Sequence, residues 1–284
     1  MTTRLPPWFR TRLANNLLSL KVRNEINNNK LHTVCQSAAC PNQTECWNSG
    51  TTTFLILGNI CTRNCRFCNI PTGKPVNVDD DEPNRVARVV AALQLSYAVV
   101  TSVTRDDLPD GGASHFAKTI REIRSMNPGC RIEVLIPDFH WSEEALIAVL
   151  VAEPDILNHN IETVPSLYSR IRPGADYGRS LELLTRATEY GSTTKTGLML
   201  GLGETIDELR SVMDDLRNSG CSILTLGQYL RPGKGHLPVE KYYHPDEFTE
   251  IRLEALSLGF NHVVSGPHVR SSYRAELCKA GDAQ

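Results

Sequence analysis

The sequence predicts an α/β fold: a partial (β/α)6 barrel of the TIM type, with an N-terminal and a C-terminal extension that cover its open end. Six short aliphatic segments alternate with stretches of helix length, and this alternation is typical of a parallel sheet with helices outside. A cysteine loop follows the first segment, where an open doubly wound sheet would usually have a phosphate-binding glycine turn. The chain of 284 residues is long enough for one such domain.

The predicted elements follow from this alternation in order. We expect strands at 53–58, 98–101, 131–136, 156–160, 195–200 and 222–226, and helices at 82–94, 113–125, 142–152, 179–190, 204–218 and 245–257. The barrel then occupies residues 53–230. It is preceded by a cysteine-rich N-terminal extension (1–52) and followed by a C-terminal extension (231–284).

Composition narrows the class of protein. A net charge of −2, with 22% charged and 40% hydrophobic residues, gives no basic bias toward nucleic acid. No apolar run approaches the roughly 18–20 residues that span a bilayer, and the first residues lack the apolar core of a secretory signal. We therefore expect a cytoplasmic protein without nucleic-acid or membrane partners, and a monomer by default.

Six of the nine cysteines lie between Cys35 and Cys68, and such clustering in a reducing compartment favours metal binding. The later group, Cys61, Cys65 and Cys68, has the spacing C-x3-C-x2-C and follows the first predicted strand. Three thiolates leave one iron of a four-iron cluster open, whereas structural zinc takes four protein ligands. Because active sites of parallel barrels gather at the C-terminal strand ends, this loop is the predicted active site.

The earlier group, Cys35, Cys40 and Cys46, has the longer spacing C-x4-C-x5-C. This suits an irregular loop around a cluster better than the C-x2-C knuckle of a zinc site, although structural zinc stays an alternative. Cys130 and Cys221 border aliphatic strands and are predicted core thiols. Cys278, in the tail, is a further candidate ligand.

Polar side chains gather where predicted strands end. They include Thr101 and Ser102 at the end of the second strand, and Asn158 and Glu162 around the end of the fourth. Arg172 follows and is able to pair with a carboxylate bidentately. Each residue has an alternative role in local loop hydrogen bonds, but their repeated placement at one edge predicts a ligand site.

The C-x3-C-x2-C motif, with Phe67 between its last two cysteines, resembles that of the radical S-adenosylmethionine (SAM) enzymes. The resemblance implies that the open iron binds the amino and carboxylate groups of SAM. One electron from the cluster then yields a 5′-deoxyadenosyl radical that abstracts hydrogen from carbon. Phe67 is an expected SAM-binding residue because it belongs to this motif. From strand-end position, the other expected SAM-binding residues are Asn69, Thr101, Ser102, Asn158, Glu162 and Arg172.

Both cysteine groups together with the tail sequence Arg270-Ser271-Ser272-Tyr273 closely resemble the lipoyl synthase family, over nearly the whole chain. The resemblance implies two 4Fe-4S clusters. The first cysteine group would hold an auxiliary cluster whose fourth ligand is a tail serine. By position we assign this ligand to Ser272, with Ser271 the second choice, and Arg270 either orients the tail or binds substrate.

The reaction implied by the resemblance is radical insertion of two sulfur atoms at C6 and C8 of a protein-bound octanoyl-lysine, with the auxiliary cluster as sulfur donor. Cys61, Cys65, Cys68 and Ser272 are then the catalytic residues. The implied partners are octanoylated lipoyl carrier domains or proteins, an electron donor such as flavodoxin or ferredoxin, and iron–sulfur cluster repair proteins. No protein acid or base is demanded, because the difficult step belongs to the cofactor.

Three alternatives stay open at this point. Another radical SAM enzyme with an auxiliary cluster is the nearest, although it lacks this combination of N-terminal cysteines and tail. A ferredoxin-like electron carrier needs eight cysteine ligands in compact runs, and here three of the nine are scattered. A zinc-stabilised binding module is colourless, whereas an iron–sulfur protein purified without oxygen is brown.

Overall fold

The computed structural model describes residues 5–9, 17–38 and 40–277. Its strands form one eight-stranded sheet in the order β1 to β8. Strands β2 to β8 are parallel, and β1 pairs antiparallel with β2. The strands are β1 (His32–Thr33), β2 (Thr52–Ile56), β3 (Tyr97–Ser102), β4 (Arg131–Leu135), β5 (Ile156–Asn158), β6 (Thr194–Leu200), β7 (Ile223–Gln228) and β8 (His262–Gly266).

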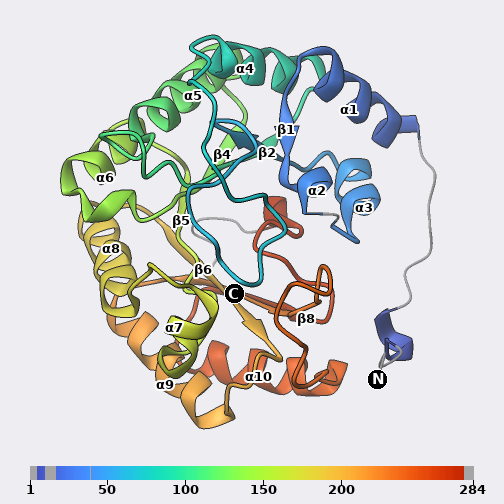
Figure 1. The fold of residues 1–284 in the computed structure, drawn as a ribbon, viewed down its shortest axis with the longest axis vertical. Helices are drawn as coiled ribbons and strands as arrows, with labels where there is room; N and C mark the ends of the chain where they lie inside the picture. The colour runs from blue at the N-terminus through green and yellow to red at the C-terminus, as the bar shows by residue number, and fades with distance from the viewer. Residues whose placement is uncertain (1–4, 10–16, 39, 278–284) are drawn as a thin grey trace.

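The helices are α1 (Leu17–Asn28), α2 (Val34–Ser37), α3 (Gln43–Asn48), α4 (Glu82–Ala92), α5 (Ala113–Met126), α6 (Glu143–Leu150), α7 (Tyr168–Ile171), α8 (Tyr177–Glu189), α9 (Ile206–Asn218) and α10 (Pro245–Ser257). The longer helices form an arc outside the parallel strands, whereas the short α2, α3 and α7 lie inside this arc (Figure 1). Four 3₁₀ turns complete the description: η1 (Pro7–Phe9), η2 (Phe139–Trp141), η3 (Pro165–Leu167) and η4 (Ala275–Leu277). No described helix has the length and apolar character needed to cross a membrane.

The α/β partial barrel is confirmed, and it contains one more parallel strand than the six predicted. The six predicted strands correspond to β2 to β7, and the six predicted helices to α4, α5, α6, α8, α9 and α10. The additional strand, β8, lies in the segment assigned to the C-terminal extension. Strand β8 has the sequence His-Val-Val-Ser-Gly, and only its Val263 is buried. It therefore lacks the continuous aliphatic run that marks the other strands.

Local signals explain where the outer helices begin and which face they bury. In α9, Thr205 accepts from the backbone of Glu208, whose side chain accepts from Thr205 in return, which is a capping box. Leu209, Val212, Met213 and Leu216 are buried at the i, i+3, i+4 and i+7 spacing of one helix face. That face packs with β6 and β7 into the C-terminal part of the core.

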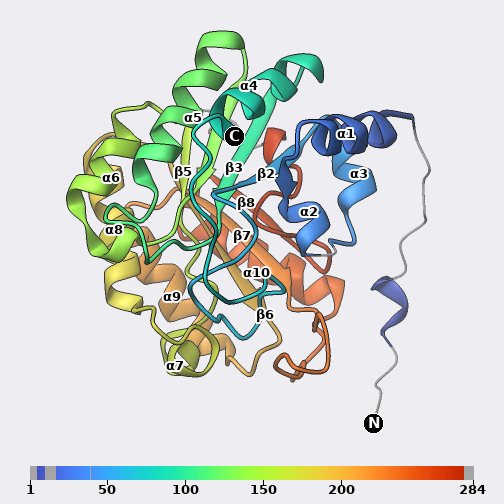
Figure 2. The same cartoon turned by 45° about the horizontal axis from the view of Figure 1, so that its top comes forward.

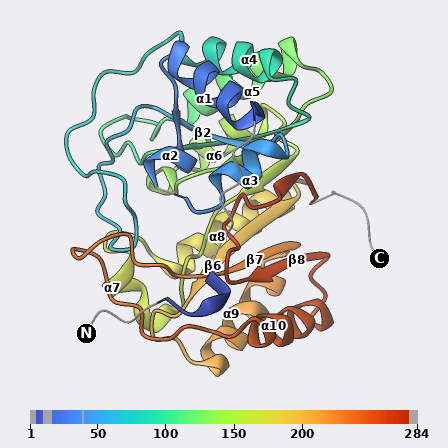
Figure 3. The same cartoon turned by 90° about the vertical axis from the view of Figure 1, so that its right-hand side faces the viewer.

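The two extensions meet beside the barrel. Helix α1 lies next to α3 and α4 (Figure 2), and the C-terminal tail runs beside α3 (Figure 3). Thr51, before β2, donates to Glu276 at 2.6 Å, and Tyr273 donates to Glu45 of α3 at 2.9 Å. Residues more than 200 positions apart in the sequence are therefore held together at one side of the barrel.

Candidate active site

The three cysteines after β2 lie close together. Burial raises the pKa of Cys68 to about 12, and the negative charges of Cys65 and Cys61 add to the rise. Burial also raises the pKa of Cys65, against the opposing charge of Arg172. Since metals bind thiolates, loading this group has to release protons from buried thiols.

Backbone donors are already directed at this group. The N–H of Arg63 lies 3.4 Å from the sulfur of Cys61, and the N–H of Thr104, after β3, lies 3.3 Å from it. His236 contacts the carbonyl oxygen of Cys68 at 3.0 Å through Nε2. Hydrogen bonds to ligand sulfurs stabilise the thiolate and tune the potential of a bound cluster.

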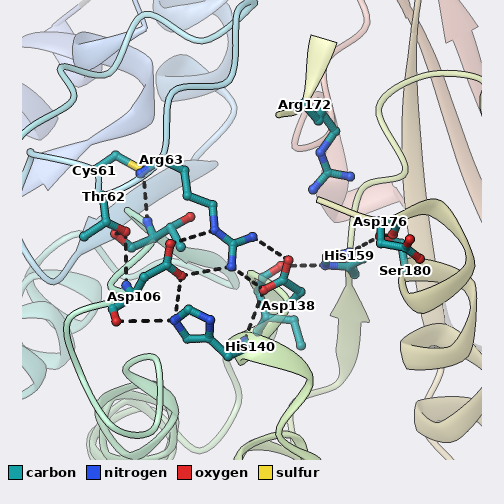
Figure 4. A network of polar contacts seen from close by, with 12 residues as sticks. Cys61, Thr62, Arg63, Asp106, Asp138, His140, His159, Arg172, Asp176 and Ser180 are labelled. Atoms are coloured by element: carbon teal, nitrogen blue, oxygen red, sulfur yellow. Dashed lines mark hydrogen bonds and ion pairs between the residues drawn. The ribbon is translucent and has the colours of Figure 1, made fainter. Parts of the chain in front are cut away.

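Arg63, between two of these cysteines, fastens the loop to the barrel (Figure 4). Its Nε and Nη2 donate to both oxygens of Asp106 after β3, at 2.8 and 2.9 Å. Its Nη1 and Nη2 donate to both oxygens of Asp138 after β4, at 2.5 and 2.8 Å. Burial opposes ionisation of Asp138, but the hydrogen bonds and charge of Arg63 outweigh it and hold the pKa of that carboxyl below its ordinary value.

The N-terminal cysteines form a second group. Burial raises the pKa of Cys46 to about 12, and the negative charges of Cys35 and Cys40 contribute to the rise, so the three thiols are neighbours. The backbone of Arg274 hydrogen-bonds the Cys46 thiol, and the charge of Cys40 acts on Arg270. Arg270 and Arg274 of the tail therefore lie close to this cysteine group. Cys278 lies outside the described residues.

Both groups are chemically suited to a cluster. Within the described part of the chain, no three His, Cys, Asp or Glu side chains converge on one ion-sized site. A cubane does not require convergence, because each thiolate binds a different iron. The three neighbouring thiols of each group would therefore fit a cluster held by three thiolates.

The strand-end residues fall into two kinds. Three predicted residues carry a buried polar atom without a hydrogen-bond partner among the described residues: Ser102 Oγ, Asn158 Oδ1 and Arg172 Nε. Buried polar atoms are nearly always satisfied, so these fit a bound ligand. Thr101, in contrast, donates to the Leu135 carbonyl at 2.8 Å, which ties β3 to β4.

The charges of Arg172 and Glu162 both act on Cys65 of the later cysteine group. Arg172 Nη1 donates to the Asn160 carbonyl and to Tyr168 Oη, both at 2.9 Å. Burial raises the pKa of Glu162, and the charge of Arg172 opposes the rise. Glu162 also has a φ of 70°, in the left-handed region, and such backbone strain is concentrated at functional sites.

Phe67 and Asn69 have different surroundings. Phe67 is half-buried and packs against the apolar cluster of Ile171, Leu202 and Tyr229. Asn69 is exposed and donates to the Ser37 carbonyl at 3.1 Å. Asn69 therefore bridges the two cysteine-bearing segments.

The structure adds polar residues that sequence reasoning missed. Glu133 and Lys195 form an ion pair at 2.9 Å with neither side chain exposed. A charged residue inside an otherwise aliphatic strand was the available signal. Arg63 also had a recognisable signal in the sequence, because it lies inside the cysteine motif. Its two aspartates come from different strand ends, and only the tertiary structure pairs them with it.

Residues 55–216 match the Radical SAM superfamily. The chain is 56% identical over 274 residues to the lipoyl synthase of Oleidesulfovibrio alaskensis, covering 96% of this chain and 94% of the relative. It is 52% identical over 278 residues to the lipoyl synthase of Caldicellulosiruptor saccharolyticus, covering 97% and 98%.

Solved structures share the fold at low identity. Methylornithine synthase (PylB) aligns with a TM-score of 0.57 and 14% identity, over 94% of this chain and 89% of that protein. Streptococcus suis SuiB bound to S-adenosylmethionine aligns with a TM-score of 0.61 and 12% identity, over 92% of this chain and 65% of that protein.

Proposed function

Because the chain belongs to the lipoyl synthase family of the Radical SAM superfamily, and is thus a radical SAM sulfurtransferase, we propose that it inserts two sulfur atoms at C6 and C8 of a protein-bound octanoyl-lysine. Membership of the superfamily implies one 4Fe-4S cluster and SAM. The proposal adds a second, auxiliary cluster as the source of sulfur. The observation that carries it is the pair of separate three-thiol groups, one on the β2 loop and one beside the tail.

When bound, the first cluster together with SAM would supply a hydrogen-abstracting radical, and the auxiliary cluster would supply sulfide. In the proposal, Cys61, Cys65 and Cys68 hold the first cluster, and Arg63 keeps their loop against the strand ends. Ser102 and Arg172 offer unpartnered polar atoms to SAM. Glu162 balances the charge of Arg172 and lies near Cys65 and Cys68.

The auxiliary side is formed by Cys35, Cys40 and Cys46, with Ser272 as the proposed fourth ligand. A serine oxygen is a harder ligand than sulfur and suits a cluster that has to open during turnover. Ser272 is half-buried, and its hydroxyl has no hydrogen-bond partner in the described part of the chain. Ser271, in contrast, uses its hydroxyl in two hydrogen bonds, which favours Ser272 as the ligand.

The proposal includes three partners. The substrate arrives as an octanoyl-lysine arm on a carrier domain or protein. A one-electron donor such as flavodoxin or ferredoxin reduces the first cluster, and a repair protein rebuilds the auxiliary one. We also propose that the protein is a cytoplasmic monomer.

The test is the mass of an octanoyl-lysine peptide after anaerobic incubation with the cluster-loaded chain, a chemical reductant and SAM. Two sulfur atoms gained per peptide, at about one product per chain, support the proposal. Cysteine variants separate the groups: Cys46→Ala should abolish sulfur insertion, and Cys130→Ala, a buried thiol outside both groups, is the matched control. SAM cleavage with an unchanged peptide in the wild type would refute the proposed substrate.

A further inference from the structure

The tail motif is fastened to the barrel through Ser271. Its hydroxyl accepts a hydrogen bond from Asn158 Nδ2 at 2.9 Å and donates one to Asn160 Oδ1 at 2.9 Å. Asn158 is the last residue of β5, and Asn160 follows two positions later. A residue 111 positions away in sequence from Asn160 is thus held at the active-site end of a central strand.

The asparagine on one side of Ser271 cannot turn freely. Asn158 Nδ2 donates its second hydrogen to Glu133 Oε1 at 3.0 Å. Glu133 is fully buried, pairs with Lys195 at 2.9 and 3.0 Å and accepts from Tyr97 at 2.7 Å. Since a side-chain amide has only two N–H hydrogens, the buried ion pair fixes the one that points to Ser271.

The asparagine on the other side is oriented as well. Asn160 Nδ2 donates to Glu162 Oε1 at 3.0 Å, which turns its oxygen toward Ser271. Gly197 of β6 leaves the space for this amide, because a Cβ at Gly197 would lie 3.0 Å from Asn160 Oδ1 and 2.7 Å from Thr225 Oγ1. The chain of hydrogen bonds therefore runs from the buried ion pair through Ser271 to Glu162.

Further hydrogen bonds, before and after Ser271, hold the tail against the N-terminal segment. Asn42 donates to the His268 carbonyl at 2.5 Å, before the motif. Tyr273 and Arg274 both donate to Glu45, at 2.9 and 3.0 Å. These bonds attach the tail to the segment that carries the N-terminal cysteines, whereas Ser271 attaches it to the barrel.

We propose that Ser271 is a positioning residue: it anchors the tail to Asn158 and Asn160, so that the neighbouring Ser272 faces the N-terminal cysteines whether or not iron is bound there. Every bond in the anchor is made by protein atoms alone. The anchor therefore persists while an auxiliary cluster is consumed and rebuilt. The role assigned to Ser271 rests on the proposed function, in which Ser272 binds that cluster.

The test compares Ser271→Ala with its neighbour Ser272→Ala by amide hydrogen exchange of residues 268–277 in the full chain, both iron-free and cluster-loaded. Losing the hydroxyl breaks two hydrogen bonds and leaves two amides unpaired. We expect Ser271→Ala to speed exchange in the iron-free chain by about tenfold or more, as for a loss of about 1.4 kcal/mol or more. Ser272→Ala should leave iron-free exchange at the wild-type rate.

A double-mutant cycle checks the route of the effect. If Ser271 acts through Asn160 as well as Asn158, Asn160→Ala should speed tail exchange on its own, and adding Ser271→Ala should then speed it by a smaller factor than Ser271→Ala does in the wild type. Ser271→Thr, which keeps the hydroxyl, should retain slow exchange. Iron release from the N-terminal group to a chelator should be several-fold faster in Ser271→Ala than in the wild type.

The anchor is refuted if Ser271→Ala leaves iron-free exchange unchanged, or if Ser272→Ala alone accelerates it. Its failure is distinguishable from failure of the proposed function, because exchange is measured without substrate. A wild-type chain that cannot convert the octanoyl peptide, but shows the Ser271-specific acceleration, would refute the function and keep the anchor.

Discussion

Replacing Arg63 by lysine should destabilise the fold although the charge is kept. The guanidinium makes four hydrogen bonds to Asp106 and Asp138, and a lysine ammonium cannot reproduce this fork. Losing about two bonds, each worth about 1.5–3 kcal/mol when charged, would cost about 3–6 kcal/mol. Since Asp106 is 25% exposed, solvent screening lowers our expectation to about 2–3 kcal/mol.

Thermal unfolding of the iron-free chain, monitored by circular dichroism, provides the assay. At about 2–4 °C per kcal/mol for a domain near this size, Arg63→Lys should lower Tm by about 4–12 °C. Arg66→Lys is the matched control, because Arg66 belongs to the same loop but is exposed; it should stay within about 0.5 kcal/mol of wild type.

The difference between wild type and Arg63→Lys should depend on pH in a defined direction. The folded pKa of Asp138 is lowered, so its contribution is fully present above the ordinary carboxyl pKa of about 4 and is lost as pH falls through the lowered value. The Tm gap should hold from about pH 5 to 8 and shrink below about pH 4. A gap under about 2 °C at pH 7, equal to that of Arg66→Lys, would refute the anchoring of the loop by Arg63.

Three further predictions concern single side chains. Burial, with the charge of Arg172, lowers the pKa of His159 to about 4. The free energy of unfolding should therefore fall as pH drops from about 6.5 toward 4. The His159→Gln variant should lose less of its stability over this window, which acid titration followed by fluorescence measures. Ser102→Ala should weaken SAM binding roughly tenfold in calorimetric titration while Tm stays unchanged, because its hydroxyl has no protein partner among the described residues; a lower Tm with unaltered binding would count against this role. Cys46→Ala should remove about half of the iron bound after reconstitution while SAM cleavage persists, and loss of all iron would contradict two independent cysteine groups.

The predictability of the fold depended on how far each strand is buried. Strands β2 and β3 are buried along nearly their whole length, so their aliphatic runs stand out in the sequence. Strand β8 has one buried residue and begins with His262, which gives no such signal. The short β1 is likewise recognisable only from its pairing with β2.

Some features of the candidate site were likewise predictable from the sequence, and others were not. Cysteine spacing identified both thiol groups, because their ligands are close in sequence. The partners of Arg63 were not predictable, since Asp106 and Asp138 lie 43 and 75 positions away. The contrast between Ser271 and Ser272 also needed the structure, because adjacent identical residues differ only in what surrounds them.

The most direct test of the central claim is to load the N-terminal cysteine group with heavy-isotope sulfide and follow a single turnover on the octanoyl-lysine peptide by mass spectrometry. An auxiliary cluster that donates its sulfur should give a product that carries two heavy sulfur atoms, at about one product per chain. A product that carries only natural-abundance sulfur from the medium, or multiple turnovers without repair, would contradict an auxiliary cluster as the sulfur source.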